Sequence, residues 1–236
     1  MAGGFARRMW PLTSTTPKQL LPLAEGYVIL DLVVDGLLEI DLEEIILSVN
    51  AKFSGAFRRW LSSRGLNIQL IEEPSRSEAE KPGAVGALHM MLGSLPRDDY
   101  LIVAGDNVTS IKYSELVGAM RFHGAPTIAL YDVGSMELAR RYGVVELGPD
   151  SRVISLIEKP NDPPSTLIST AIYAMPWRSL SRIEEYLASV RAEPVYGFRF
   201  NGFWFDVGSI DEYDRVRELF SQGVIERPRH VVLPSM

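Results

Sequence analysis

The chain has 236 residues, of which 46% are hydrophobic and 23% are charged, with a formal net charge of −6 and no cysteine. This length suits one large α/β domain or two small ones with a substantial core. The absence of cysteine excludes disulfides, thiolate metal sites and cysteine catalysis. The acidic balance gives no reason to expect nucleic-acid binding. No apolar run suits a membrane helix or a signal peptide, so we expect a cytoplasmic protein without a membrane partner.

Buried strands and amphipathic helices alternate along the first half of the chain. The patterns predict helices near 27–38, 53–64, 84–92 and 114–122, and strands near 45–49, 67–71, 100–104 and 127–131. Such alternation favours a Rossmann-like, doubly wound and mostly parallel sheet. Short strand-like runs at 141–147, 153–158 and 167–173 predict a small antiparallel insertion. A helix near 180–190, a strand near 195–200, a helix at 211–220 and a tail at 223–236 follow.

The first eighteen residues combine glycine and positive charge with almost no acid. The adjacent Gly3 and Gly4 allow backbone N–H groups to approach an anion closely, because no Cβ intervenes. Arg8 can offer a planar fork to phosphate oxygens, and Lys18 a compact charge. This is the outline of a triphosphate-binding loop, although the G-x-x-x-x-G-K-[ST] pattern is absent. A disordered basic N-terminus is the alternative reading that the local sequence leaves open.

Two aspartates follow strand-like runs in distant parts of the chain. Asp106 comes directly after Leu101-Ile-Val-Ala-Gly, and Asp206 follows an aromatic run and precedes a predicted helix. Ligands of open α/β sheets bind beyond the carboxyl ends of the strands. Two carboxylates meeting there suit magnesium, which is typically held by one or two carboxylates together with substrate phosphates. An N-terminal helix cap is an equally good local interpretation of Asp206.

Glu158-Lys159-Pro160 forms a third polar cluster at the end of a predicted strand. Glu158 could accept hydrogen bonds from hydroxyl groups while Lys159 neutralises a phosphate. Taken alone, the pair is better explained as a surface ion pair.

These stretches together resemble the sugar-1-phosphate nucleotidyltransferase family over nearly the whole chain. Ala2-Gly-Gly-Phe-Ala-Arg-Arg-Met-Trp-Pro-Leu-Thr, followed by Pro17-Lys18, resembles A-G-G-x-G-T-R-L-x-P-L-T and P-K of that family. Gly83-Ala-Val-Gly-Ala-Leu is similar to its G-T-A-G-A-L. The later motifs occur in the family's order: Gly105-Asp-Asn, Tyr142-Gly-Val-Val, Glu158-Lys-Pro, Ile172-Tyr and Trp204-Phe-Asp-Val-Gly.

The resemblance implies that a sugar-1-phosphate oxygen attacks the α-phosphorus of a nucleoside triphosphate in line, with Mg²⁺ as cofactor, and pyrophosphate leaves. It implies catalytic roles for Arg8 and Lys18, and magnesium ligation by Asp106 and Asp206. The implied nucleotide contacts are Ala2, Gly3, Gly4, Gly83 and Asp106, and the implied sugar-phosphate contacts are Gly143, Glu158 and Lys159. The implied catalytic domain spans residues 1–222, with a nucleotide half at about 1–110 and a sugar-phosphate half at about 111–222. Whether the protein forms a homo-oligomer is left open by the resemblance.

The chain departs from the family pattern in its opening loop and before it. Ala6-Arg7 replaces Gly-Thr, so a left-handed backbone at position 6 would cost about 1 kcal/mol relative to glycine. Family members carry a short strand before A-G-G, whereas only Met1 precedes Ala2 here. We therefore expect the sheet to lack its usual first strand, with residues 231–233 or a partner chain partly filling the gap.

Three alternative functions can be compared with this pattern. The first is a catalytically weak or inactive homologue that binds nucleotide sugars and regulates another protein. The second is a cytidylyltransferase acting on a phosphate that is not a sugar phosphate. The third, a nicotinamide-dependent oxidoreductase, requires a G-x-G-x-x-G turn that the sequence lacks.

Overall fold

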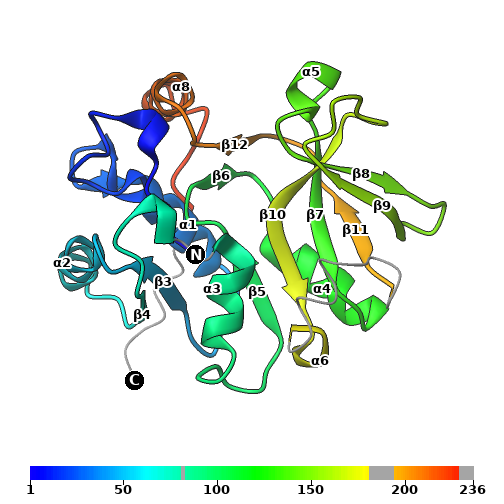
Figure 1. The fold of residues 1–236 in the computed structure, drawn as a ribbon, viewed down its shortest axis with the longest axis horizontal. Helices are drawn as coiled ribbons and strands as arrows, with labels where there is room; N and C mark the ends of the chain where they lie inside the picture. Colours follow the sequence, from blue (N-terminus) through cyan, green and yellow to red (C-terminus); the bar gives the residue numbers. More distant parts are fainter. Residues whose placement is uncertain (81–82, 181–193, 229–236) are drawn as a thin grey trace. The chain divides into compact units, whose positions relative to one another are not determined.

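A computed structural model describes residues 1–80, 83–180 and 194–228 of the chain. The chain divides into two compact units. Figure 1 labels the helices and strands from which they are built. Unit 1 consists of Met1–Ala87, Gly105–Thr109 and Phe205–Met236, and unit 2 consists of Leu88–Ala104 and Ser110–Trp204. Each unit is discontinuous in sequence, and each is described by itself below.

The described residues of unit 1 form a parallel strand pair, helices and short strands. Its elements are β1 (Pro22–Ala24), β2 (Tyr27–Val28), α1 (Ile29–Leu37), β3 (Ile46–Asn50), α2 (Ser54–Arg64), β4 (Gln69–Glu73), β6 (Asn107–Thr109) and α8 (Ile210–Ser221). β3 and β4 run parallel, with Asn50 opposite Glu73 at their carboxyl ends. Helix α3 (Gly83–Met91) begins in this unit. β6 pairs with β12 (Trp204–Asp206), of which residues 205 and 206 belong to unit 1.

Helical periodicity explains α2, which connects the two parallel strands. Phe57 and Trp60 are three residues apart and buried, so one face of the helix packs inward. The helix ends at Gly65, whose φ of 64° is left-handed, the conformation that glycine adopts without steric cost. Strand, helix and strand together form a parallel βαβ unit, as the alternating sequence predicts.

The first residues of the chain lie beside β3. The Ala2 N–H donates to the Ser48 carbonyl (2.7 Å), and Ala2 forms a parallel bridge with Val49. The Gly105 N–H donates to the Met1 carbonyl (2.8 Å). Met1 and Ala2 therefore join β3 to the turn that carries Asp106. Residues 231–233, expected to help at this position, lie outside the described residues.

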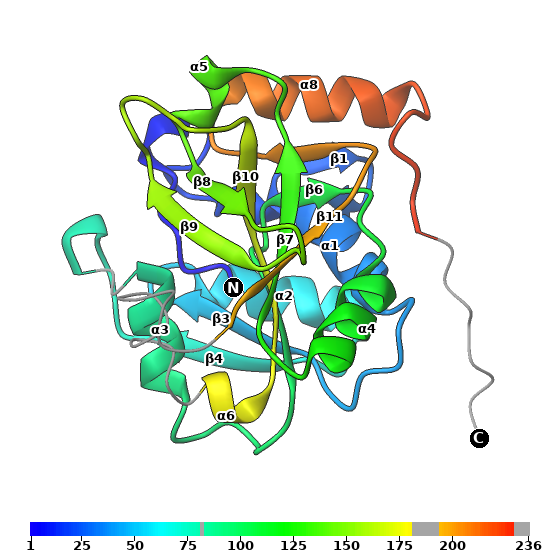
Figure 2. The same cartoon turned by 90° about the vertical axis from the view of Figure 1, so that its right-hand side faces the viewer.

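Unit 2 is built on a six-stranded mixed sheet in the order β11-β7-β10-β8-β9, with β5 also pairing with β10. Its elements are β5 (Tyr100–Val103), α4 (Tyr113–His123), β7 (Thr127–Asp132), α5 (Met136–Ala139), β8 (Gly143–Leu147), β9 (Val153–Glu158), β10 (Leu167–Met175), α6 (Trp177–Leu180) and β11 (Tyr196–Arg199). β10 is antiparallel to β5, β7 and β8, whereas β11 is parallel to β7. Helix α4 contacts β7, β10 and β11 (Figure 2).

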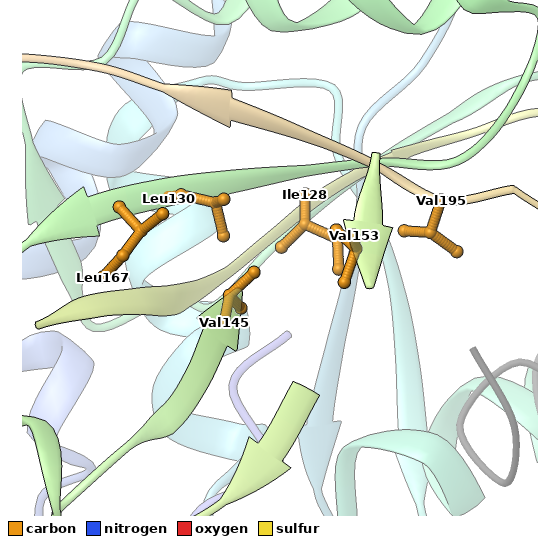
Figure 3. Close-up of a cluster of buried hydrophobic side chains, with 6 residues drawn as sticks. All are labelled: Ile128, Leu130, Val145, Val153, Leu167 and Val195. Atoms are coloured by element: carbon orange, nitrogen blue, oxygen red, sulfur yellow. The ribbon is translucent and has the colours of Figure 1, made fainter. Parts of the chain in front are cut away.

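The sheet of unit 2 curls until its first and last strands meet. The Val153 N–H donates to the Val195 carbonyl (2.8 Å), and Arg152 forms an antiparallel bridge with Tyr196. The curled sheet encloses a cluster of branched aliphatic side chains (Figure 3): Ile128, Leu130, Val145, Val153, Leu167 and Val195. This core holds β8, β9 and β10 together, and these strands carry the polar residues of unit 2 described below.

The structure confirms the predicted α/β class, with a mixed central sheet. Parallel pairing is observed for β3–β4 and for β11–β7. Antiparallel pairing extends beyond the predicted insertion, because β10 also pairs antiparallel with β5 and β7. The helix expected near 180–190 lies almost entirely within residues 181–193, which are outside the described residues. Among the described residues, no helix is both long enough and apolar enough to cross a lipid bilayer.

Candidate functional site

The opening loop, defined here as residues 3–16, is packed within unit 1. Phe5, Met9 and Thr13 are buried, and the Thr13 hydroxyl donates to the Ala6 carbonyl (2.7 Å). A 3₁₀ turn covers Arg7–Met9. Ala6 precedes it with φ 48° and ψ 42°, so the left-handed conformation considered for this position is present. The loop is therefore a packed element, and the structure does not support a free basic terminus.

Gly3 and Gly4 have different surroundings. A Cβ on Gly3 would lie 2.7 Å from Cδ of Glu73, whose carboxylate covers Gly3. Glu73 is buried and accepts a hydrogen bond from the Ser48 hydroxyl. A Cβ on Gly4 would contact nothing within 4 Å. Gly3 thus leaves room for a buried carboxylate, while open space lies next to Gly4.

Four charged side chains that lie far apart in the sequence gather in unit 1. The Lys18 ammonium forms an ion pair with the Asp106 carboxylate, and the two side chains are only 12% and 15% exposed. The Val207 N–H donates to the Asp106 carbonyl (3.2 Å), which sets Asp206 beside Asp106. The Arg8 Nη2 atom lies 3.7 Å from the position of a Cβ on Gly208. The structure therefore brings together Arg8, Lys18, Asp106 and Asp206.

Asp206 is not the N-cap of the helix that follows it. Ser209 caps α8, and its hydroxyl accepts a hydrogen bond from the Glu212 N–H (3.3 Å). The Glu212 carboxylate in turn accepts from the Gly208 N–H (3.0 Å). Since Ser209 is the cap of α8, the Asp206 carboxylate is not needed for that role and lies in the charged cluster.

Burial and neighbouring charges shift the pKa values within this cluster. Burial acts to lower the pKa of Lys18, but the adjoining Asp106 carboxylate outweighs it and raises the pKa above its ordinary value. Burial, followed by repulsion from Asp106, raises the pKa of Asp206, although Lys18 opposes this shift. Two neighbouring carboxylates are therefore costly to ionise together, and a cation between them would relieve that cost.

The two carboxylates of this cluster, Asp106 and Asp206, are too few to coordinate a metal ion through protein ligands alone. Within the described ranges, no group of three or more His, Cys, Asp or Glu side chains is placed to hold a metal ion. Magnesium is commonly held by one or two carboxylates, with waters and substrate phosphates completing its six ligands. The oxygen atoms of Asp106 and Asp206 fit that type of site.

Unit 2 has its own polar cluster at the ends of β8 and β9. Gly143 pairs with Glu158 across these strands, and a Cβ on Gly143 would lie 3.1 Å from the Glu158 carboxylate. Lys159 follows with a left-handed φ of 45°, and its ammonium lies 3.1 Å from the Glu158 carboxylate. Both side chains are more than half exposed, so the ion pair alone contributes little to stability.

A distortion in β10 adds two hydroxyl groups to this cluster. The hydroxyl oxygens of Ser169 and Tyr173 are 3.5 Å apart. In a regular strand the backbone advances about 13 Å over four residues, so these two side chains would not meet. Ala171, at φ 58°, breaks the strand between them. Burial raises the pKa of Tyr173, so its hydroxyl stays protonated at neutral pH. Ser169 also lies beside Gly143, with its Cβ 3.8 Å from the position of a Gly143 Cβ.

The residues that the sequence singles out divide between the two units. Unit 1 holds Ala2, Gly3, Gly4, Arg8, Lys18, Gly83, Asp106 and Asp206, and unit 2 holds Gly143, Glu158 and Lys159. Geometry adds Glu73 beside Gly3, and Ser169 beside Gly143. No local sequence signal identifies Glu73, because a carboxylate at the end of a strand is common. The left-handed backbone of Ala171 in β10 likewise has no signal in the sequence that would predict it.

The fold is α/β, and unit 1 combines a packed glycine-containing loop with a buried lysine–aspartate cluster. The sequence model of the nucleotidyl transferase family matches residues 1–222, and the chain belongs to this family.

Curated relatives agree with the branch of the family that the motifs resemble. The chain is 27% identical to a glucose-1-phosphate adenylyltransferase of Thermotoga neapolitana, over 90% of this chain and 57% of that protein. It is also 27% identical to a provisionally named mannose-1-phosphate guanyltransferase of Sulfolobus acidocaldarius, over 92% of this chain and 60% of that protein. The chain therefore spans less than two thirds of the length of these relatives.

A solved structure has a similar fold. It is a provisionally named glucose-1-phosphate thymidylyltransferase of Bacillus anthracis in complex with sucrose. The TM-score is 0.80 at 22% sequence identity, with 92% of each chain covered.

Proposed function

We propose that this protein transfers a nucleotidyl group from a nucleoside triphosphate to a sugar-1-phosphate, giving a nucleotide sugar and pyrophosphate. The observation that carries the proposal is the gathering of Arg8, Lys18, Asp106 and Asp206 in unit 1 of a nucleotidyl transferase family member. Relatives named for adenylyl and guanyl transfer to sugar-1-phosphates support the same reaction class. Neither the base nor the sugar follows from these residues.

In the proposed reaction a sugar-1-phosphate oxygen bonds to the α-phosphorus, and the bond from this phosphorus to the bridging oxygen of the β-phosphate breaks. The electron pair of that bond leaves with pyrophosphate. The attacking oxygen is already anionic, so no side chain needs to remove a proton. Arg8 and Lys18 stabilise negative charge on the triphosphate and the departing pyrophosphate, which is the main task in phosphoryl-type transfer.

The remaining residues bind and orient the substrates. Gly3 and Gly4 present backbone groups to the nucleotide, together with Ala2 and Gly83. Glu158 accepts hydrogen bonds from sugar hydroxyls, Gly143 leaves room beside it, and Lys159 neutralises the sugar phosphate. Asp106 and Asp206 would hold magnesium, which when bound screens phosphate charge and orients the reacting groups. We further propose that the protein acts in the cytoplasm.

Replacing Asp106 tests this assignment. Asp106→Asn removes a charge from the proposed cation site and the partner of Lys18, so turnover should fall by about 10²–10³-fold or more. The measurement is pyrophosphate release with magnesium, accompanied by circular dichroism and a melting curve to establish that the variant is folded. Asp41→Asn, at an exposed position of unit 1, is the matched control and should retain full activity. Near-normal turnover of a folded Asp106→Asn variant would overturn the metal assignment.

The competing function is that of an inactive homologue that binds nucleotide sugar. The presence of all four charged residues in one cluster favours catalysis over this alternative. A protein that binds a nucleotide sugar, yet releases no pyrophosphate with any combination of substrates, would establish the alternative.

A further inference from the structure

The opening loop contains an arginine whose charge the proposed chemistry does not use. Arg7 precedes Arg8 and occupies the position at which the resemblance predicts threonine. The Arg7 side chain is exposed. Its guanidinium carbon lies 5.3 Å from the centroid of the Trp10 ring. A cation within about 6 Å of an aromatic ring centroid is attracted by the electron density of the ring face. Arg7 is therefore directed at a neighbour in its own loop.

Local structure explains why these two side chains meet. Arg7 begins the 3₁₀ turn, and the Trp10 N–H donates to the Arg7 carbonyl (3.2 Å). Residues three apart in a 3₁₀ turn project in the same direction. The turn follows directly from Ala6, whose left-handed backbone positions Arg7 against Trp10.

A second cation reaches the same ring from another element. The Lys52 ammonium lies 5.9 Å from the Trp10 ring centroid and 4.7 Å from that of Phe53. It also donates a hydrogen bond to the Ser14 carbonyl of the opening loop (3.1 Å). Within the described residues, neither Arg7 nor Lys52 forms an ion pair with a carboxylate. Both charges are thus directed to the loop and its aromatic ring.

Two more contacts join the opening loop to the segment that contains Lys52, defined here as the anchor segment, residues 50–53. The Asn50 side-chain amide donates to the Gly3 carbonyl (3.1 Å). The Phe5 and Phe53 rings, both buried, have centroids 6.2 Å apart. The anchor segment therefore contacts the loop near its start, in its middle and near its end.

We propose that Arg7, Trp10 and Lys52 form a clasp that holds the opening loop on the anchor segment. Arg7 is then a positioning residue that acts through Trp10, and it does not bind phosphate. The clasp keeps the turn that carries Arg8 in one conformation, which reduces the conformational entropy lost when nucleotide binds. This consequence for nucleotide binding rests on the proposed function, whereas the clasp itself is a property of the free protein.

Limited proteolysis of the ligand-free full chain tests the clasp directly. Trypsin cleaves after Arg8 only when the loop opens, so the rate of cleavage at Arg8–Met9, identified by mass spectrometry, reports loop opening. Trp10→Leu and Lys52→Met should each increase this rate roughly two- to fivefold. Trp10→Phe, which keeps an aromatic ring, and Lys52→Arg, which keeps the charge, should restore most of the protection. Leu12→Ala, at another exposed position in the loop, is the control and should leave the rate unchanged.

A double-mutant cycle separates a clasp from independent effects. If Trp10 and Lys52 act through each other, the double variant should be cleaved less rapidly than the product of the two single effects predicts. Effects that multiply fully, or an unchanged rate in Trp10→Leu, would overturn the clasp. Melting temperatures measured in parallel should change little, since Trp10 is half-exposed.

Binding of inorganic tripolyphosphate, measured by calorimetry, tests the role of Arg7. For a positioning residue, Arg7→Gln should weaken binding only while Trp10 is present, with no further loss in the Trp10→Leu background. An equal loss in both backgrounds would make Arg7 a phosphate ligand and overturn the proposal. If the unaltered protein fails to bind tripolyphosphate, the proposed function is challenged, while the proteolysis results still decide the clasp.

Discussion

At the scale of single residues, the packing around Gly3 leaves little room for a Cβ, whether or not a ligand is bound. The Glu73 carboxylate occupies the space of a Cβ at this position and is bonded to Ser48, so it cannot withdraw without losing a buried hydrogen bond. The resemblance assigns Gly3 to nucleotide binding. The contact with Glu73 gives a separate reason for glycine at this position, and this reason concerns folding.

Gly3→Ala should therefore destabilise the protein even without ligand. Overpacking of this kind costs about 1–3 kcal/mol in the free energy of unfolding. Gly4→Ala is the matched control, because its Cβ would contact nothing within 4 Å, and it should leave stability nearly unchanged. Urea denaturation of both variants measures the difference. Equal stabilities would mean that Glu73 moves aside freely.

Asp206 provides a prediction about pH. Its pKa is raised from 3.8 by burial and by Asp106, so the folded state holds this proton more tightly than the unfolded state does. The free energy of unfolding should therefore fall as pH rises from below 3.8 through the raised pKa, because ionisation costs more in the folded protein.

Asp206→Asn should remove that penalty and raise the melting temperature of the metal-free protein at pH 7. The gain should disappear below pH 3.8, where Asp206 is protonated in both states. Asp211→Asn, at an exposed position in the first turn of α8, should not show this gain. Added magnesium should stabilise the unaltered protein more than Asp206→Asn, through preferential binding to the folded state. A lower melting temperature for metal-free Asp206→Asn would contradict this account.

At the scale of elements, a buried polar network connects α1 with α2. Asp31 and Asp35, one turn apart on α1, are almost fully buried. Arg64, in the last turn of α2, lies 2.9 Å from Asp31 and 3.1 Å from Asp35. The Trp60 indole N–H donates to Asp31 (2.9 Å), and the Tyr27 hydroxyl donates to Asp35 (2.6 Å). The network sets the position of α2, the helix that follows the anchor segment.

Removing Arg64 should take away the cation that the two buried carboxylates share. Arg64→Met should reduce the free energy of unfolding by about 3 kcal/mol or more, since one partner of a buried ion pair is lost. Arg58→Met, in the same helix but 63% exposed and 3.9 Å from Glu72, should cost less than about 1 kcal/mol. Urea denaturation at pH 7 compares the two. Similar losses for both variants would show that the network contributes no more than a surface pair.

Sequence patterns predict the long elements better than the short ones. α1, α2, β3 and β4 are predictable because apolar residues recur with clear periods. The short strands β6 and β12 have three residues each, too few for any period, yet they bring Asp106 and Asp206 together. The convergence of these aspartates could be expected from their places after strand-like runs and from the order of the family motifs, but not from any period in β6 or β12.

At the scale of the whole molecule, the family model matches residues 1–222 and therefore covers parts of both units, each of which is discontinuous in sequence. The four charged residues proposed for phosphate chemistry lie in unit 1, and the residues proposed for the sugar phosphate lie in unit 2. The division into a nucleotide half and a sugar-phosphate half at about residue 110 stays a prediction. Base and sugar preference could not be predicted from the sequence, because the chain is equally similar, at 27% identity, to relatives named for different bases and different sugars.

The most direct test of the central proposal is a matrix of common nucleoside triphosphates against glucose-, mannose- and N-acetylglucosamine-1-phosphate, followed by pyrophosphate release. We predict release with at least one pair, dependent on magnesium, abolished by chelation and lost in Asp106→Asn but not in Asp41→Asn. The matching nucleotide sugar should accumulate in equal amount. No pyrophosphate from any pair, with folded protein and magnesium present, would contradict the proposed function.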